Sequence, residues 1–203
     1  MRRASKEKIR ERVLCLSACV LMLALSAPAY AIPILPGGSG RPPASSSLAA
    51  GDVIASSALP FSGRNVLGEV LFTGTLATAV ILESASQTLN FVYSVVNNST
   101  SPDGIARMSV TNFAGVTTDI GWVSESPGDI GPGSVTRQPT GATISFNFDN
   151  FLRPGQETGL LFVKTNATDF HRGSVSLING GVANISAFAP LASSVATVPE
   201  PAT

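Results

Sequence analysis

The stretch Thr143-Ile144-Ser145-Phe146-Asn147-Phe148-Asp149 alternates apolar and polar side chains over seven residues. Ile144, Phe146 and Phe148 would lie on one face of an extended chain and the polar residues on the other, because successive side chains of a strand point to opposite sides. A period of two over this length predicts a β-strand with one buried face. The stretch therefore indicates a sheet that covers a hydrophobic core.

Further short segments show the same period or a run of apolar and β-branched residues. They are residues 66–75, 80–83, 89–95, 108–113, 116–122, 160–165, 175–178 and 182–188. Turn-forming sequences such as Pro102-Asp103-Gly104 and Asn179-Gly180-Gly181 separate them. About eight to ten strands at this spacing predict an all-β fold, a single antiparallel β-sandwich or jelly-roll-like domain. Residues 77–86 are the one segment that also has some helical character.

We expect the aromatic side chains of this domain to fill its core, because they hide the most apolar area. They are Phe61, Phe72, Phe91, Phe113, Trp122, Phe146, Phe148, Phe162 and Phe188. A second interpretation applies to Trp122 and Tyr93. An aromatic ring exposed on a sheet can stack on a sugar, so these two residues are possible glycan contacts.

Residues 1–31 have the three parts of a signal peptide. Six basic residues lie before the apolar stretch Val13–Ala27, and Ala29-Tyr30-Ala31 is a small-x-small cleavage site. The 15 apolar residues fall short of the roughly 20 that a membrane-spanning helix needs. We therefore expect a signal helix that hands the chain to Sec-type export machinery and is cleaved after Ala31.

Both cysteines, Cys15 and Cys19, lie in this leader. The exported chain would then hold no disulfide, cysteine nucleophile or cysteine metal site. Leu16-Ser17-Ala18-Cys19 also has the form of a lipoprotein cleavage box, but the apolar stretch continues beyond Cys19. An ordinary cleaved signal fits this pattern better.

Composition divides the remainder into three parts. Residues 32–50 are rich in Pro, Gly and Ser and predict a flexible linker. Residues 51–188 hold the predicted strands and have the length of one domain. Residues 189–203 form a low-complexity tail.

The chain carries 13 basic and 13 acidic residues. The leader holds six basic and two acidic residues, which leaves seven and eleven for residues 32–203. Charged residues make up 13% of the chain, about half of the roughly 25% in an average domain. A mildly acidic domain of low charge excludes a basic nucleic-acid binder, and we expect no nucleic-acid partner.

The residue types needed for catalysis form no recognisable constellation. His171 is the single histidine and lies near Asp169, but no Gly-x-Ser-x-Gly elbow accompanies them. The carboxylates that could serve glycoside hydrolysis show no marked pair. They are Glu69, Glu83, Glu125, Asp149 and Glu157.

Metal and phosphate sites are equally unsupported by motif. Asp149-Asn150, or Asp103 with Asn97-Asn98, could each supply one or two calcium ligands, but the sequence has no calcium loop. It has no zinc motif and no glycine-rich phosphate loop. We expect no enzyme, no catalytic residue, no metal and no cofactor.

The sequence Val198-Pro199-Glu200-Pro201-Ala202-Thr203 follows a spacer of Ser, Ala and Thr. It resembles the Pro-Glu-Pro motif that opens the C-terminal sorting signal of the PEP-CTERM family, proteins exported by Gram-negative bacteria that make extracellular polysaccharide. The N-terminal leader is similar to those of that family. More loosely, residues 165–190 resemble the last strands of its small β domains.

The resemblance implies that an exosortase recognises residues 198–201. It also implies a membrane helix and a basic stop after the motif, whereas this sequence ends at Thr203. Two interpretations stay open: a gene that continues beyond this point, or a freely secreted form.

Together these features predict an exported, non-enzymatic protein of the outer cell surface or extracellular matrix, associated with exopolysaccharide in a biofilm. The alternative is a secreted carbohydrate-binding module. A secreted hydrolase that uses Glu and Asp side chains is a further, less favoured interpretation.

Overall fold

The computed structural model describes residues 30–124 and 129–192, and this part of the chain contains thirteen strands and no helix. The prediction that the fold class is antiparallel all-β is confirmed. The expected signal helix lies outside the described residues. The strands are β1 (Ile32–Pro33), β2 (Ser39–Gly40), β3 (Ala44–Ser45), β4 (Gly51–Arg64), β5 (Val70–Glu83), β6 (Leu89–Asn97), β7 (Ile105–Val110), β8 (Thr118–Val123), β9 (Ser134–Arg137), β10 (Ile144–Leu152), β11 (Leu160–Thr165), β12 (Asp169–Ile178) and β13 (Val182–Leu191).

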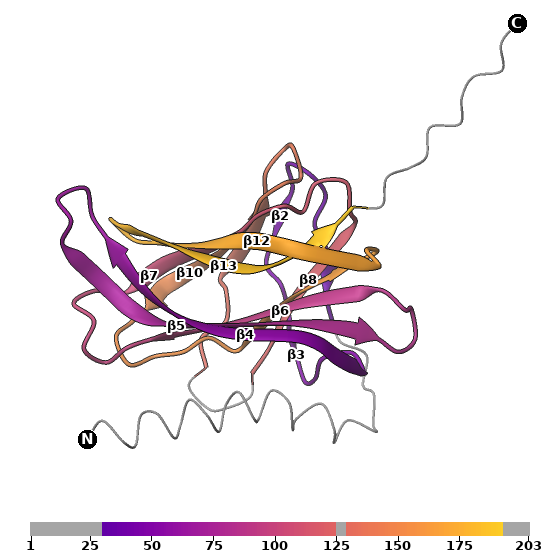
Figure 1. Cartoon of the computed structure of the whole chain (residues 1–203), viewed down its shortest axis with the longest axis horizontal. Helices are drawn as coiled ribbons and strands as arrows, with labels where there is room; N and C mark the ends of the chain where they lie inside the picture. The colour runs from indigo at the N-terminus through magenta and orange to yellow at the C-terminus, as the bar shows by residue number, and fades with distance from the viewer. Residues whose placement is uncertain (1–29, 125–128, 193–203) are drawn as a thin grey trace, which may run out of the picture.

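The strands join in one nearly closed, barrel-like sheet. Its order is β1-β8-β11-β6-β5-β4-β13-β12-β7-β10-β9-β2, and β3 pairs with β8. All of these pairs are antiparallel except that of β3 with β8. β4 and β13 are joined only at Arg64 and Val182, so the path bends there and its two halves face each other as two layers (Figure 1).

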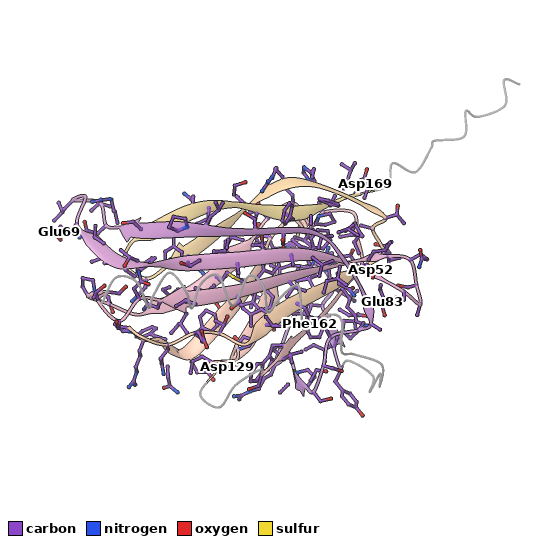
Figure 2. The ribbon with its side chains drawn as sticks, turned by 60° about the horizontal axis from the view of Figure 1, so that its bottom comes forward. Asp52, Glu69, Glu83, Asp129, Phe162 and Asp169 are labelled. Atoms are coloured by element: carbon purple, nitrogen blue, oxygen red, sulfur yellow. The ribbon has the colours of Figure 1, made fainter. Side chains whose placement is uncertain are left out.

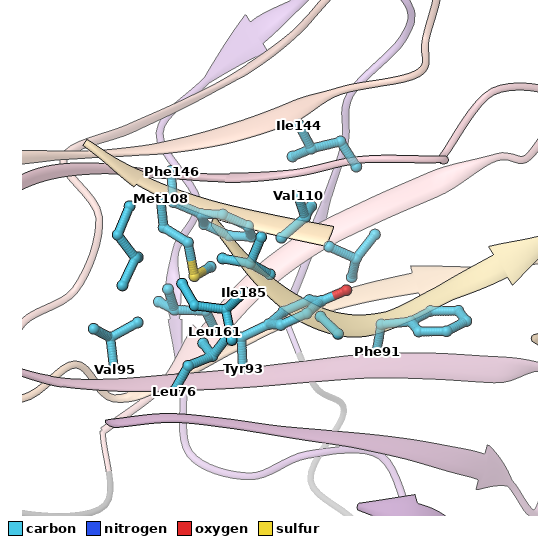
Figure 3. Packing of buried hydrophobic residues seen from close by; sticks show 14 of the residues in the cluster. Leu76, Phe91, Tyr93, Val95, Met108, Val110, Ile144, Phe146, Leu161 and Ile185 are labelled. Carbon is cyan, nitrogen blue, oxygen red and sulfur yellow. The ribbon is translucent and has the colours of Figure 1, made fainter. Parts of the chain in front are cut away.

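The main core lies between these layers. Side chains of β5, β6 and β11 meet those of β7, β10, β12 and β13 across it (Figure 3). All eight phenylalanines that we assigned to the core are buried, each 7% exposed or less. Trp122 is half-buried and packs at the border of the same cluster.

Residues 32–45, here named the N-terminal strap, differ from the flexible linker that their composition predicts. β1 pairs with β8 at one end of the sheet, and β2 pairs with β9 at the other. The side chain of Ile34 is 3% exposed within the main core. Its amide donates to the carbonyl of Thr118 at 3.1 Å. Gly and Pro dominate the average composition, but the strap is held by edge pairing and by the buried residues Ile34, Pro42 and Ser45.

Two longer strands also depart from the sequence prediction. β4 was not expected, because its Ala, Ser and Pro residues show weak apolar alternation. It nevertheless pairs with β5 from Gly51 to Arg64. The segment 77–86 with helical character lies in β5 and the turn after it. Pairing along β4 and β6 overrides the weak helical preference there. The strand number exceeds the expected eight to ten because β1, β2, β3, β4 and β9 were not expected.

Candidate binding groove

An open groove of about 800 Å³ lies beside the strap, where the two ends of the sheet approach each other. Four parts of the chain line it: the strap, β8, the segment before β9, and the end of β10 with the loop that follows. The lining residues are Arg41, Pro42, Pro43, Ala44, Trp122, Asp129, Ile130, Gly131, Pro132, Gly133, Asp149, Asn150, Phe151, Arg153 and Gln156.

Phe151 lines the groove from an irregular part of β10. The register of β10 against β7 shifts between Asn147 and Leu152. Within this irregularity Phe151 has a φ of +55°, a left-handed conformation that is rare for a bulky side chain. Its side chain is 48% exposed. The alternation of β10 places this odd-numbered position on the outward side, so its aromatic ring faces the groove.

Trp122 forms part of another wall. The backbone of Gly131 lies directly against the six-membered ring of its indole, and a Cβ atom on Gly131 would collide with that ring. Gly159 also lies against the indole: a Cβ atom added to Gly159 would be 2.9 Å from Cε3 of Trp122. The indole is therefore fixed by two glycines and contributes only part of its surface to the groove.

Asp149 is held at the rim by two contacts. Its carboxylate lies against Gly133, where a Cβ atom would collide with it. Its Oδ2 lies 3.6 Å from Nη2 of Arg41 in the strap. Both side chains are more than half exposed, so this ion pair contributes at most about 1 kcal/mol to stability. Breaking this ion pair so that Arg41 and Asp149 can bind a ligand would therefore cost little free energy.

The loops beside the groove are fixed by hydrogen bonds. The amide of Ile130 donates to the carbonyl of Glu157 at 2.9 Å, and Gly159 donates to the carbonyl of Ile130 at 3.2 Å. The amide of Arg153 donates to Oε1 of Gln156 at 2.8 Å. These bonds preorganise the lining residues, which lowers the entropy cost of binding.

The groove combines aromatic surface with hydrogen-bonding groups of both kinds. Arg41 and Arg153 offer donors, Asp129 and Asp149 offer acceptors, and Asn150 offers both. The two cations and two anions balance. A mostly polar groove with aromatic rings and convergent donors and acceptors suits an uncharged, hydroxyl-rich ligand.

Tyr93, the second predicted glycan contact, is 1% exposed and points into the core (Figure 3). Its hydroxyl donates to the carbonyl of Phe188 at 3.1 Å. Burial raises the pKa of this phenol above its ordinary value. The expectation of a glycan contact at Tyr93 is therefore corrected: the ring fills the space between the two layers and leaves no face free for a sugar.

The sorting motif Val198, Pro199, Glu200 and Pro201 lies outside the described residues, as does Ala29. Ala31 lies directly before β1 and packs against a smaller apolar cluster that includes Ile81, Val92 and Phe162. The predicted cleavage point therefore lies immediately before the first strand.

The other polar residues considered from the sequence serve local structure. Oδ1 of Asp169 accepts the amide of Phe170 at 2.8 Å. The guanidinium of Arg172 lies 4.7 Å from the ring centre of Phe188. Asn97 is buried and donates to the carbonyls of Asp103 and Leu152. Lys164 pairs with Glu83 at 3.4 Å.

Over residues 30–124 and 129–192, no group of three or more His, Cys, Asp or Glu side chains could hold a metal ion. Within the same ranges no helix has the length and hydropathy of a membrane span.

Sequence reasoning missed Phe151 and Arg41 as groove residues. A signal for Phe151 was present: buried positions of β10 are even-numbered from Ile144 to Phe148, and Phe151 is an aromatic residue at an odd-numbered position. Arg41 carried no such signal, because its role depends on the strap lying beside β10.

Comparison of the chain with protein-family models, with curated proteins and with solved structures found no match. The chemistry of the groove therefore has to be inferred from its own residues.

Proposed function

We propose that this chain is an exported, non-enzymatic protein of the cell surface or the exopolysaccharide matrix of a Gram-negative bacterium. The observation that carries the proposal is the sequence Val198-Pro199-Glu200-Pro201 after a small-residue spacer, in a chain that begins with a three-part leader. Sec-type export machinery would move the chain across the inner membrane, and an exosortase would recognise the motif.

Two structural features support export. Cleavage after Ala31 would leave β1 (Ile32–Pro33) and the whole strap intact. The described domain has a core large enough to fold without a disulfide, and the only cysteines lie in the leader. Both agree with a chain that folds after its leader has been removed.

The sorting role is tested by replacing Pro199, Glu200 and Pro201 with Ala in the chromosomal gene of the native bacterium. The parent protein should be found in the surface and matrix fractions, and the triple variant should shift to the periplasm and envelope. A control variant with Ser193→Ala, Ser194→Ala and Thr197→Ala in the spacer should distribute like the parent. Equal distribution of the parent and the triple variant would contradict recognition of the motif.

A second candidate function is carbohydrate binding, and the groove favours it specifically. Trp122, retained from the two predicted glycan contacts, lines the groove together with Asp149 and Arg41. Affinity electrophoresis in gels that contain soluble polysaccharides tests this function directly. Unchanged mobility in every polysaccharide gel would argue against it.

A further inference from the structure

We propose that Phe151 is the principal aromatic contact of the groove and that the ligand is a neutral glycan chain. This inference rests on the second candidate function and extends it, by naming the stacking residue, the polar partners and the charge class of the ligand.

The backbone at Phe151 is the first observation. A φ of +55° costs about 1–3 kcal/mol for a non-glycine residue. Gly104 makes room for it, because a Cβ atom there would lie 2.9 Å from Cβ of Phe151. Asn, Asp or Gly would adopt this conformation more readily. Phe151 has a strained backbone and is 48% exposed, so it contributes little to the stability of the fold. This is typical of a residue that contacts a ligand.

The neighbours of Phe151 supply the second observation. Asp149 and Asn150 directly precede it, and Arg41 reaches the same rim from the strap. The exposed carboxylate of Asp149 lies 3.6 Å from the guanidinium of Arg41. This pair offers hydrogen-bond acceptors and donors at the spacing of adjacent hydroxyl groups on a sugar. Vicinal hydroxyls of a sugar can donate to one partner and accept from the other, while the apolar face of the sugar ring lies on the aromatic side chain.

The charge balance selects the class of glycan. Asp129 and Asp149 would face the carboxylates of an acidic polysaccharide, and their repulsion would offset attraction to Arg41 and Arg153. A neutral chain meets no such repulsion and can hydrogen-bond to the exposed pair Arg41 and Asp149. Figure 2 shows Asp129 near the lower edge of the view, apart from Asp52, Glu83 and Asp169.

The openness of the groove favours a chain over a single sugar. Residues from four separate parts of the polypeptide line it. An enclosed pocket would bury a terminal sugar from all sides, whereas an open groove leaves part of the ligand in solvent, so that a longer chain can extend beyond the groove.

The experiment measures binding of the full-length exported protein to three neutral polysaccharides: dextran, galactomannan and xyloglucan. Polygalacturonate serves as the acidic probe. Affinity electrophoresis at about 0.15 M salt gives a dissociation constant for each. We expect at least one neutral polysaccharide to retard the parent and polygalacturonate to leave it unretarded.

Phe151→Gly should weaken that binding at least tenfold, and Phe151→Tyr should retain it within threefold. Glycine removes the ring and the backbone strain together, so the thermal midpoint should stay within about 4 °C of the parent. Leu67→Ala is the matched control, because Leu67 is 80% exposed in the β4–β5 turn and does not line the groove. Its binding should equal that of the parent.

Each outcome tests a different part of the proposal. Retardation by polygalacturonate alone would keep carbohydrate binding and overturn the neutral ligand. Retardation of Phe151→Gly equal to that of the parent would overturn the role of Phe151. Mobility unchanged in all four gels would overturn this inference and the second candidate function, while the sorting proposal would be judged by its own experiment.

Discussion

At the scale of single residues, Arg137 joins three parts of the fold. It is 4% exposed, and burial lowers the pKa of its guanidinium. The group donates to the carbonyls of Gly141, Ile34, Phe113 and Val116 and to Oγ1 of Thr118, at 2.8–3.1 Å. None of these partners is a carboxylate, so five hydrogen bonds together offset the cost of burying the charge.

Arg137→Met should lower the free energy of unfolding by about 3 kcal/mol, because several buried oxygens lose a donor and each unpaired group costs about 1–3 kcal/mol. Urea unfolding at pH 7 measures this change. Arg107→Met is the control at an exposed arginine, with an expected change within about 0.5 kcal/mol. Equal stability of the two variants would show that the buried bonds contribute nothing.

Tyr93 gives the protein a dependence on alkaline pH. Its pKa is raised by burial, while the unfolded chain titrates near the ordinary value of 10.0. Below that pH both states hold the proton. Above it the unfolded state loses the proton first, so stability falls as pH rises, by at most about 1.4 kcal/mol per pH unit.

Tyr93→Phe should be less stable than the parent by about 1 kcal/mol at pH 7, since the bond to Phe188 is lost. Because the variant lacks the titrating phenol, the difference should shrink above pH 10 and change sign near about pH 11. Urea unfolding from pH 7 to pH 12 measures both curves. Parallel curves across this range would contradict a buried, protonated Tyr93.

At the scale of elements, the β4–β5 hairpin depends on close approach of a glycine to an aromatic ring. Gly63 lies opposite Phe72 in the register of the two strands. A Cβ atom at Gly63 would collide with the Phe72 ring, which is fully buried. The absence of a side chain at Gly63 therefore allows the ring of Phe72 to pack over β4.

Gly63→Ala should destabilise the protein by about 1–3 kcal/mol, because a buried ring has to move within a packed core. Thermal and urea unfolding provide the measurement. Ser62→Ala on the exposed side of the same strand serves as the control and should change stability by less than about 0.5 kcal/mol. An equally mild effect of both substitutions would contradict the contact.

The same hairpin shows where sequence patterns succeed and fail. In β10, by contrast, residues 144–149 alternate strongly, as their sequence pattern predicts. β4 alternates weakly because Ala, Ser and Pro60 occupy it, and its position follows only from pairing with β5. Pro60 is consistent with a strand whose outer edge is largely unpaired, since proline donates no hydrogen bond. Local patterns therefore predicted the strands that bury large side chains, and missed β4 together with the short strands β1, β2, β3 and β9.

At the scale of the whole molecule, the strap determines both the closure of the sheet and the groove. Its pairing joins β8 to β9, strands that lie near opposite ends of the sheet order. Composition predicted flexibility for residues 32–50, because a window average hides the few side chains that dock. The same limit applies to the groove: Trp122 was recognised by residue type, whereas Arg41 and Phe151 depend on tertiary placement and on an irregular strand.

We propose that this chain is exported with its leader removed and its strap intact. The most direct test is to recover the protein from cytosolic, periplasmic, surface and medium fractions of its native bacterium and to determine its N-terminus by mass spectrometry. We expect a chain that begins at Ile32 and is found in the surface or medium fraction. A chain that begins at Met1 and is confined to the cytosol would contradict it.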